Sequence, residues 1–464
     1  MSNIKVIVDR DEMVAIADAV RNKMGESIEY NVFDIATGIN NIGLSNENIP
    51  INDVTFYDYD GTVLYSYSKE EALALTSMPA LPEHNGLISQ DWNWSLEDMV
   101  ANVQNCGKCN IGALYMTNDG KTRIYITLQE GRTSPMLGCC PNGEVMIDWG
   151  DGTEPVTLTG NRTSKVQWTP THEYSSSGDY VITLDVIDGE LGLYGSSATN
   201  CWSGILRHSS SADVKNIHYM NDVRKIELGN NVTDFNGNAF NNCRNLSTIT
   251  FPNSPITLGG SIFQNCYSLK SVVFPNGVTN LGSSTFYYCN SLSNVSIPSS
   301  IQYLSSSTFY GCNTLSNVVL PYIDINNVVK DSLLQDCWNI SEITIPYGAT
   351  KISSNAFIRC YKLSNVVIPE TITEIGTYAF NECYNITNVN IPNSVLSIGH
   401  YSFGDCYGLA KIRFNSTTPP TIQSTSFNKL PADCIISVPT GCLSAYTSAT
   451  NYPSSTSYTY IEED

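Results

Sequence analysis

The chain has 464 residues, and its 24 basic and 44 acidic side chains give a net charge of −20. This charge disfavours binding of nucleic acid or of an anionic membrane surface through bulk electrostatics. No run of 18 apolar residues predicts a membrane-spanning helix, and the first residues lack the apolar stretch of a signal peptide.

Residues 1–45 are expected to form a helical segment. Met13, Ile16, Val20 and Met24 have the spacing of an amphipathic helix, and a similar pattern follows from residue 32. Two short helices bury little apolar surface, so we expect this segment to dock on a partner or on itself.

Residues 46–118 are expected to form a small α+β module. Apolar and polar residues alternate on both sides of Asp60-Gly61, which predicts a β-hairpin with a tight turn. Ser95, with Asp98 three residues further on, predicts the start of a helix.

Residues 119–195 are rich in alternating strand patterns. The run Ile-Asp-Trp-Gly-Asp-Gly-Thr at 147–153, His172-Glu-Tyr174 and the later Gly-Asp-Tyr180 resemble a PKD-type β-sandwich. The resemblance implies that Gly-Asp-Gly forms a tight turn, that the later Tyr packs in the core, and that the domain is a spacer without chemistry.

Two groups of residues have the character of metal ligands. Carboxylates suit Ca²⁺ and thiols suit Zn²⁺; the residues are Asp148, Asp151 and Glu173 for the first ion, and Cys106, Cys109, Cys139 and Cys140 for the second. An ordinary β-turn and structural cysteines explain the same residues, and we predict that no metal or other cofactor is bound.

The second half of the chain repeats with a period of 23 residues, or 25 at one step, which predicts a solenoid over about residues 226–438. The clearest column of the repeat is Cys243, Cys266, Cys289, Cys312, Cys337, Cys360, Cys383 and Cys406. A Phe lies three residues before most of these cysteines, and short strands such as Val366/Ile368 end at a Pro. We expect the thiols to form a reduced, buried ladder. Segments 196–225 and 433–464 are the expected caps.

The repeat Leu-x-x-Ile-x-Ile-Pro-x-x-(Val/Ile)-x-x-Ile-Gly-x-x-x-Phe-x-x-Cys resembles the BspA-like leucine-rich repeat, with the clearest copy at residues 363–383. One coil departs from it, because Asp324–Lys330 carries two extra residues and Leu334 replaces Phe. That coil is expected to bulge. The predicted fold is therefore multidomain and mostly β: N-terminal helices (1–45), the α+β module (46–118), the PKD-like sandwich (119–195) and the capped solenoid (196–464).

The front of the chain, over residues 9–110, resembles the N-terminal parts of tail and baseplate structural proteins of phages of gut bacteria. The matching residues are Ile16-Ala-Asp-Ala-Val-Arg-Asn-Lys-Met-Gly, Phe56-Tyr-Asp-Tyr-Asp-Gly-Thr and Trp92-Asn-Trp-Ser-Leu. The resemblance implies a virion protein assembled in the host cytoplasm. Its front would contact other tail or baseplate proteins, its solenoid would bind the host surface, and a homotrimer is possible.

Aromatic residues recur next to the repeat cysteines and two residues before the Phe. Exposed rows of rings can stack on sugars, whereas packing between adjacent coils is the alternative. The candidate ligand-binding residues are Tyr267, Trp338, Tyr361, Tyr378, Tyr384, Tyr401 and Tyr407. The expected ligand is a bacterial surface polysaccharide or protein.

Two other functions remain open. The best-known context of BspA-like repeats implies a bacterial cell-surface adhesin, which would need a signal peptide and an anchor. A depolymerase of capsular polysaccharide would need two carboxylates in a groove. Glu370 and Glu374 share one coil, but nothing else in the sequence distinguishes them, so we predict that the protein is not an enzyme.

Overall fold

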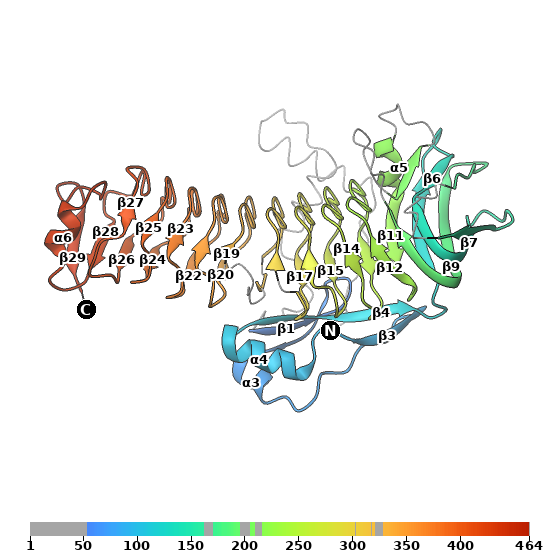
Figure 1. Ribbon diagram of the computed structural model, residues 1–464, viewed down its shortest axis with the longest axis horizontal. Helices are drawn as coiled ribbons and strands as arrows, with labels where there is room; N and C mark the ends of the chain where they lie inside the picture. Colours follow the sequence, from blue (N-terminus) through green and yellow to red (C-terminus); the bar gives the residue numbers. More distant parts are fainter. Residues whose placement is uncertain are drawn as a thin grey trace, which may run out of the picture. The chain divides into compact units, whose positions relative to one another are not determined.

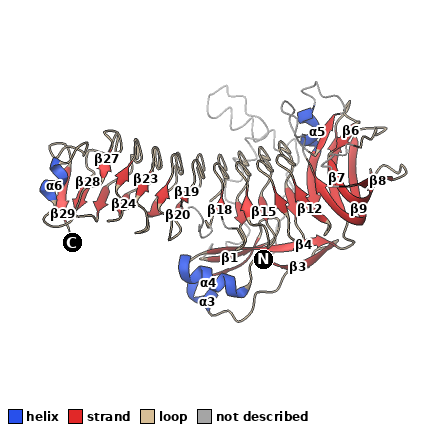
Figure 2. Ribbon diagram, in the orientation of Figure 1, coloured by secondary structure: helices blue, strands red, loops and turns tan. Residues whose placement is uncertain are grey.

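The computed structural model describes residues 53–161, 170–194, 205–208, 216–301, 303–316, 318–320 and 328–463. The predicted helical segment 1–45 and most of the predicted bulge at 324–330 lie outside these ranges. Strands dominate the described part of the chain (Figures 1 and 2). None of its helices has the length and apolar content needed to cross a bilayer.

The α+β module begins the described chain and has a four-stranded sheet with the order β2-β1-β4-β3. Its elements are β1 (Val54–Tyr57), β2 (Val63–Tyr67), α3 (Lys69–Leu73), β3 (Leu87–Trp92), α4 (Leu96–Cys106) and β4 (Cys109–Thr117). The hairpin β1–β2 turns at Gly61, which has a φ of 90°. Ser95 caps α4 by accepting a hydrogen bond from the Asp98 amide at 3.0 Å. Both sequence predictions are confirmed.

The region after the module, residues 122–193, is rich in β-strands. Its strands are β5 (Thr122–Leu128), β6 (Pro135–Leu137), β7 (Cys139–Asp148), β8 (Val156–Gly160) and β9 (Gly178–Leu193). Buried residues alternate strictly with half-buried ones along β5, so that Ile124 and Ile126 enter the core. Assignment of this region to the PKD family stays a prediction.

This β-rich region is joined to the solenoid by strand pairing, and the domain boundary at residue 195 stays a prediction. Strand β5 pairs with β11 (Val223–Glu227), and the end of β9 pairs with β12 (Val232–Phe235), so one sheet runs into the first coil. Short elements β10 (Leu206–His208) and α5 (Asn216–Asp222) lie beside it. The predicted N-terminal cap at 196–225 lies partly outside the described residues and stays a prediction. Strands β5 and β9 satisfy the edge of the first coil, whose backbone groups need partners.

The solenoid coils contribute strands to two parallel columns. Partners in most neighbouring coils are 23 residues apart, as in Ser271↔Asn294 and Lys351↔Glu374, and partners in the last coils are 24 apart, as in Lys411↔Ile435. The first column contains β11, β13 (Thr248–Thr250), β15 (Ser271–Val273), β17 (Asn294–Ser296), β20 (Glu342–Thr344), β22 (Asn365–Val367), β24 (Asn388–Ile391), β26 (Lys411–Phe414) and β28 (Ile435–Val438). The second contains β12, β14 (Thr257–Leu258), β16 (Asn280–Leu281), β18 (Tyr303–Leu304), β19 (Val328–Val329), β21 (Lys351–Ile352), β23 (Glu374–Ile375), β25 (Ser397–Ile398) and β27 (Thr421–Ile422).

The interior of the coils is built from ladders of identical side chains. Phe263, Phe286 and Phe309 stack at centroid distances of 5.6 and 5.5 Å. Leu334 fills the next position and is fully buried. Each repeat thiol from Cys266 onward donates to a carbonyl of the preceding coil, for example Cys289 Sγ to Phe263 O at 3.0 Å. The buried cysteine ladder is confirmed.

The last described elements cover the C-terminal end of the solenoid, where residues 433–464 are the expected cap. Strand β28 pairs with β26, and β29 (Thr459–Glu462) pairs with β28. Helix α6 (Leu443–Ser448) places Tyr446 5.2 Å from Phe414. The apolar end of the coil stack is thereby covered.

The α+β module packs against the first strand column of the early coils, where β4 contacts β13, β15 and β17 (Figure 1). Gly112 of β4 allows this approach, because a Cβ atom there would lie 2.5 Å from both Val273 methyl groups. Outward residues such as Ser271 are buried by the module, whereas Asn365 and Val367 on β22 are exposed. The outer sheet face is thus open on the later coils.

Candidate ligand-binding surface

Four aromatic side chains form a continuous row on the later coils, which we call the aromatic ladder: Trp338, Tyr361, Tyr384 and Tyr407. Each directly follows a repeat cysteine, and the 23-residue register places each ring over the next. Successive ring centroids are 6.0, 5.0 and 5.5 Å apart, with interplanar angles of 32°, 14° and 23°. The structure therefore brings four of the seven candidate residues together.

The other three candidates do not join the aromatic ladder. Tyr378 and Tyr401 stack on each other at 5.0 Å and 3°, two residues before their Phe, at positions with positive φ. Tyr267 stands apart because Asn290 and Asn313 occupy its position in the following coils. The Arg244 guanidinium lies 5.3 Å from the Tyr267 ring centroid.

The stacking limits where a ligand can bind. Tyr361 and Tyr384 have ladder rings on both sides, so their faces are used in packing between coils. Trp338 and Tyr407 end the aromatic ladder and are its most exposed members, at 44% and 55%. A sugar ring binds an aromatic side chain through the ring face, so the two end residues are the available platforms.

A column of charged residues accompanies the aromatic ladder, one residue before each cysteine. Arg359 pairs with Asp336 of the preceding coil through two contacts of 2.5 and 2.8 Å. Two coils further on, Lys429 Nζ lies 2.7 Å from Asp405 Oδ1. Hydrogen-bonding groups of both signs therefore flank the rings.

The tyrosine hydroxyls are held by carboxylates of their own coils. Tyr384 donates to Glu382 Oε2 at 3.0 Å, and Tyr407 donates to Asp405 Oδ1 at 2.7 Å. Burial and the Glu382 hydrogen bond raise the pKa of Tyr384 to about 12. The bond to Asp405 likewise raises the pKa of Tyr407. The two hydrogen bonds hold the phenol rings of Tyr384 and Tyr407 in place.

A further aromatic cluster was missed from the sequence. Tyr287 and Tyr310 stack at 4.5 Å, and Tyr288, which is 38% exposed, lies 5.4 Å from Tyr310 with nearly perpendicular rings. Tyr287 and Tyr310 both occupy the position two residues before a repeat cysteine. Comparing that column at the 23-residue period would have revealed the pair.

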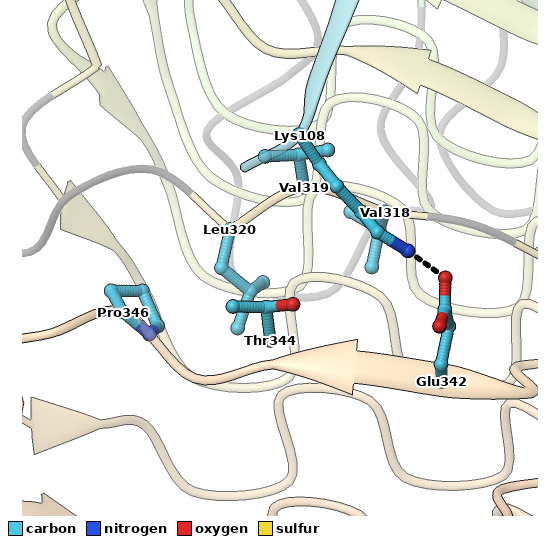
Figure 3. A pocket seen from close by; sticks show the side chains of 7 residues that line it. All are labelled: Lys108, Val318, Val319, Leu320, Glu342, Thr344 and Pro346. Carbon is cyan, nitrogen blue, oxygen red and sulfur yellow. Dashed lines mark hydrogen bonds and ion pairs between the residues drawn. The ribbon is translucent and has the colours of Figure 1, made fainter. Parts of the chain in front are cut away.

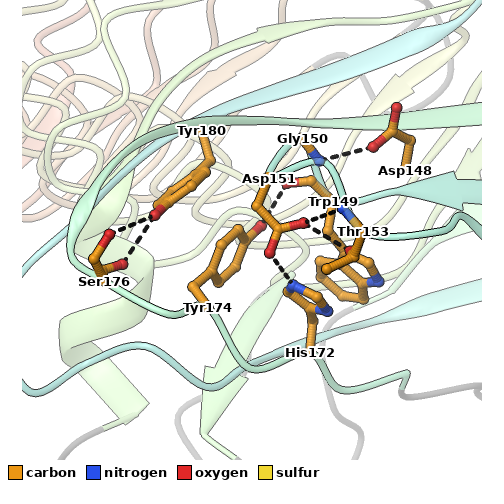
Figure 4. Close-up of polar contacts among 9 residues, drawn as sticks. All are labelled: Asp148, Trp149, Gly150, Asp151, Thr153, His172, Tyr174, Ser176 and Tyr180. Atoms are coloured by element: carbon orange, nitrogen blue, oxygen red, sulfur yellow. Dashed lines mark hydrogen bonds and ion pairs between the residues drawn. The ribbon is translucent and has the colours of Figure 1, made fainter.

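Two of the candidate calcium residues, Asp148 and Asp151, belong to an ordinary turn, as Figure 4 shows, and the third, Glu173, is exposed. Asp148 accepts from the Gly150 amide at 2.8 Å, and Asp151 accepts from Thr153 Oγ1 and lies 2.7 Å from His172 Nε2. Burial opposes ionisation of Asp151, but the bonds from Thr153 and His172 lower its pKa to about 2. Both carboxylates are thus used by the turn, which has the form that the PKD resemblance implies.

Of the four candidate zinc thiols, the side chain of Cys106 lies outside the described residues, and the other three do not gather. Cys109 is in the core of the module, whereas Cys139 is in the core shared by the β-rich region and the solenoid. Among the described residues, no cluster of three or more His, Cys, Asp or Glu side chains has the arrangement of a metal site.

The small cavity at the junction of module and solenoid does not suit a ligand (Figure 3). Its volume is about 20 Å³, and the Lys108–Glu342 ion pair borders it beside Val318 and Thr344. This volume is comparable with a single water site. The cavity therefore belongs to the packing of the junction.

Comparison with protein families identifies the repeats. A model described as a BspA type leucine rich repeat region matches residues 214–331 and 327–442, in six copies. Residues 214–442 are therefore a BspA-type leucine-rich repeat region, which confirms the resemblance for this part of the chain. No match was found among curated proteins.

Several solved structures are similar to the chain. A leucine-rich repeat protein from Bacteroides ovatus has 20% identity and a TM-score of 0.43, covering 60% of this chain and 76% of its own. A leucine rich cell surface protein from Faecalibacterium prausnitzii has 20% identity and a TM-score of 0.31, with coverages of 52% and 79%. The pneumococcal vaccine antigen PcpA has 17% identity and a TM-score of 0.33, with coverages of 52% and 68%. At these values the likenesses assign no function.

Proposed function

Because residues 214–442 are a BspA-type repeat region, we propose that this protein is a bacterial cell-surface adhesin. Its solenoid binds a polysaccharide or protein of a bacterial or host surface, without catalysing a reaction. The family match favours this function over the tail-protein interpretation, since surface adhesion is the best-known context of such repeats.

The aromatic ladder is the observation that carries the proposal. Its end residues, Trp338 and Tyr407, offer exposed rings, and Asp336, Arg359 and Asp405 lie in the adjacent charged column. Rings beside hydrogen-bonding groups suit a saccharide, whose apolar faces stack and whose hydroxyls bond. A few weak contacts of this kind on each chain, multiplied by many copies on a surface, give useful avidity.

The test is binding of the labelled full-length protein to gut-bacterial cells and to polysaccharides purified from their surfaces. Trp338→Ala and Tyr407→Ala are expected to weaken binding at least tenfold, because truncating a ring at the centre of a contact costs about 1.5–2 kcal/mol or more. Tyr347→Ala is the matched control, since Tyr347 is 67% exposed and lies outside the aromatic ladder.

Three results would contradict the proposal or part of it. Absence of binding to every cell type and polysaccharide would exclude adhesion. Equal affinities of Trp338→Ala, Tyr407→Ala and the unmodified protein would move the site away from the aromatic ladder. Shortening of the bound polysaccharide would favour the depolymerase alternative. There, Glu374 would first have to leave its contact of 2.8 Å with Lys351.

The tail-protein interpretation remains the alternative. It depends on the resemblance over residues 9–110 and requires this part to contact other virion proteins, in a homotrimer or otherwise. Copurification of the protein with phage particles from a lysed culture would favour it. Recovery from the surface of intact cells would favour the adhesin.

A further inference from the structure

The aromatic ladder is closed along its length and open at its two ends. Tyr361 and Tyr384 each lie between two ladder rings, with centroid distances of 6.0, 5.0 and 5.5 Å along the row. Centroid distances of about 4.5–7 Å are those of aromatic rings in direct contact, so no sugar ring fits between them. The ring faces open to a ligand are therefore the outer faces of Trp338 and Tyr407.

The sequence ends the ladder on both sides. In the coil before Trp338, Asn313 follows the repeat cysteine, and residues 428–433 in the coil after Tyr407 include no aromatic side chain. Among the described residues, Trp338 and Tyr407 each contact one other ring only. Their exposed fractions of 44% and 55% agree with one packed face and one open face on each side chain.

The two outer faces point in opposite directions. Successive rings lie over one another within 32° of parallel, so the ring planes cross the direction in which the coils stack. Three coil steps of about 4.8 Å separate the two ends by about 14 Å. A polymer running along the coils would meet ring edges, and a single polymer stacked on both faces would have to turn sharply around both ends. Each end therefore suits a separate polymer segment that lies across the coils.

Each end also has a hydrogen-bond donor for the hydroxyls of a sugar. The indole N–H of the exposed Trp338 side chain has no hydrogen-bond partner among the described residues. At the other end, Lys429 Nζ lies 2.7 Å from Asp405 Oδ1, and the Lys429 side chain is 62% exposed. An ammonium group has three N–H donors, so it serves a ligand as well as Asp405. The two ends are thus complete and separate platforms.

We infer that one chain binds two saccharide segments at the same time, one on the outer face of Trp338 and one on the outer face of Tyr407, and thereby cross-links polysaccharide chains. The inference rests on the proposed function, which makes a saccharide the ligand of the aromatic ladder. It adds the number of sites and their opposite directions. Loss of one platform converts two-point attachment into one-point attachment, which is the reason that either variant weakens binding to cells.

The experiment uses the full-length protein and labelled trisaccharides prepared from a gut-bacterial surface polysaccharide that the protein binds. Trisaccharides are too short to turn around both ends of the ladder. Equilibrium dialysis at saturation is expected to give two trisaccharides per unmodified chain and one for Trp338→Ala or Tyr407→Ala. The affinity of the remaining site should stay within about twofold, because the two platforms are distant and share no partner.

Three further variants and one assay complete the experiment. The double variant with Ala at both positions should bind no trisaccharide. Trp338→Phe retains a ring face and should bind two, as should Tyr347→Ala outside the aromatic ladder. Beads coated with the intact polysaccharide should be agglutinated by the unmodified protein, and much less by either single variant when equal amounts of protein are bound.

One trisaccharide per unmodified chain would overturn the inference. Single variants that lower the affinity without lowering the number bound would do the same, once thermal unfolding shows that they are folded. If either result accompanies ladder-dependent binding to cells, or if only a surface protein is bound, the adhesin proposal stands and this inference fails. Absence of binding to cells and to every polysaccharide would overturn both.

Discussion

Asn93 joins the module to the solenoid through a fully buried amide. Its Nδ2 donates to Phe274 O at 3.2 Å and Ser296 O at 3.3 Å, while its Oδ1 accepts from the Gly112 amide at 2.8 Å. The neighbouring Trp94 Nε1 donates to Ile297 O at 2.9 Å. A single side chain thus satisfies backbone groups of two distant segments, which makes the junction specific.

Replacing Asn93 with Ala should lower the free energy of unfolding by about 2–3 kcal/mol, because buried donors and acceptors lose their partners. Hydrogen exchange of β4 amides should accelerate, since the module loosens from β15 and β17. Asn388→Ala is the control, because the Asn388 amide is exposed and bonds the adjacent Thr387 side chain. Unchanged unfolding and exchange in Asn93→Ala would show that the junction does not depend on this amide.

The cysteine ladder shows how a repeated element determines the chemistry of its members. Burial raises the pKa of Cys243, Cys266, Cys289, Cys312 and Cys383 well above the usual value of a thiol. The thiols therefore remain protonated and donate to carbonyls of the preceding coil. Such groups act as small apolar side chains rather than as nucleophiles.

The stability of the solenoid should decrease as the pH rises above about 8.5, the ordinary pKa of a thiol. The folded thiols have raised pKa values and keep protons that the unfolded chain releases, so their contribution is complete below this pH and is lost above it. Each buried thiol contributes up to about 1.4 kcal/mol per pH unit. Thermal unfolding between pH 7.5 and 9.5 measures the effect.

Alanine at both Cys289 and Cys312 should make this pH dependence less steep, which separates the thiols from other titrating groups. An unchanged slope in the double variant would contradict the assignment. Thiol labelling gives a second measurement, because the half-buried Cys442 should react in the folded protein while the ladder cysteines react only after unfolding.

At the scale of the whole molecule, one apolar core runs from β5 to α6. Each coil is stabilised by packing against its neighbours. The two end coils lack one neighbour, so their open ends must be covered for the solenoid to be soluble. Strands β5 and β9 close the first end, and β28, α6 and β29 close the second. The fold therefore depends on caps that do not follow the repeat.

Removing residues 433–463 should lower the melting temperature and cause self-association. The truncation uncovers the β26 edge and Phe414, and unpaired edges recruit other chains. Size-exclusion chromatography with light scattering measures the association. Tyr446→Phe is the matched mild variant, because it keeps the packing and loses only the hydroxyl bond to Ser416 O. A monomeric, equally stable truncated protein would show that the segment is not a cap.

Much of the fold follows from the sequence, because it is encoded locally or periodically. The 23-residue spacing determines both strand columns, the Phe and Cys ladders and the alignment of Tyr361, Tyr384 and Tyr407. The Ser95 cap and the Asp60-Gly61 turn are local features of a few residues. The first strand column has an exception, because the structure assigns no strand to residues 318–320, which occupy the same position of the repeat.

Features that depend on distant, non-repeating segments could be identified only from the tertiary structure. Asn93 and Phe274 are 181 residues apart in the sequence and contact each other in the structure. Strands β5 and β11 are also distant in the sequence, and they pair through backbone hydrogen bonds that have no sequence signature. The same is true of ring faces: periodicity aligns the aromatic side chains, but only their packing shows that Trp338 and Tyr407 remain open. The repeat specifies each coil. The covered ends and the docked module depend on segments outside the repeat, which pair with backbone edges and apolar surfaces that have no neighbouring coil.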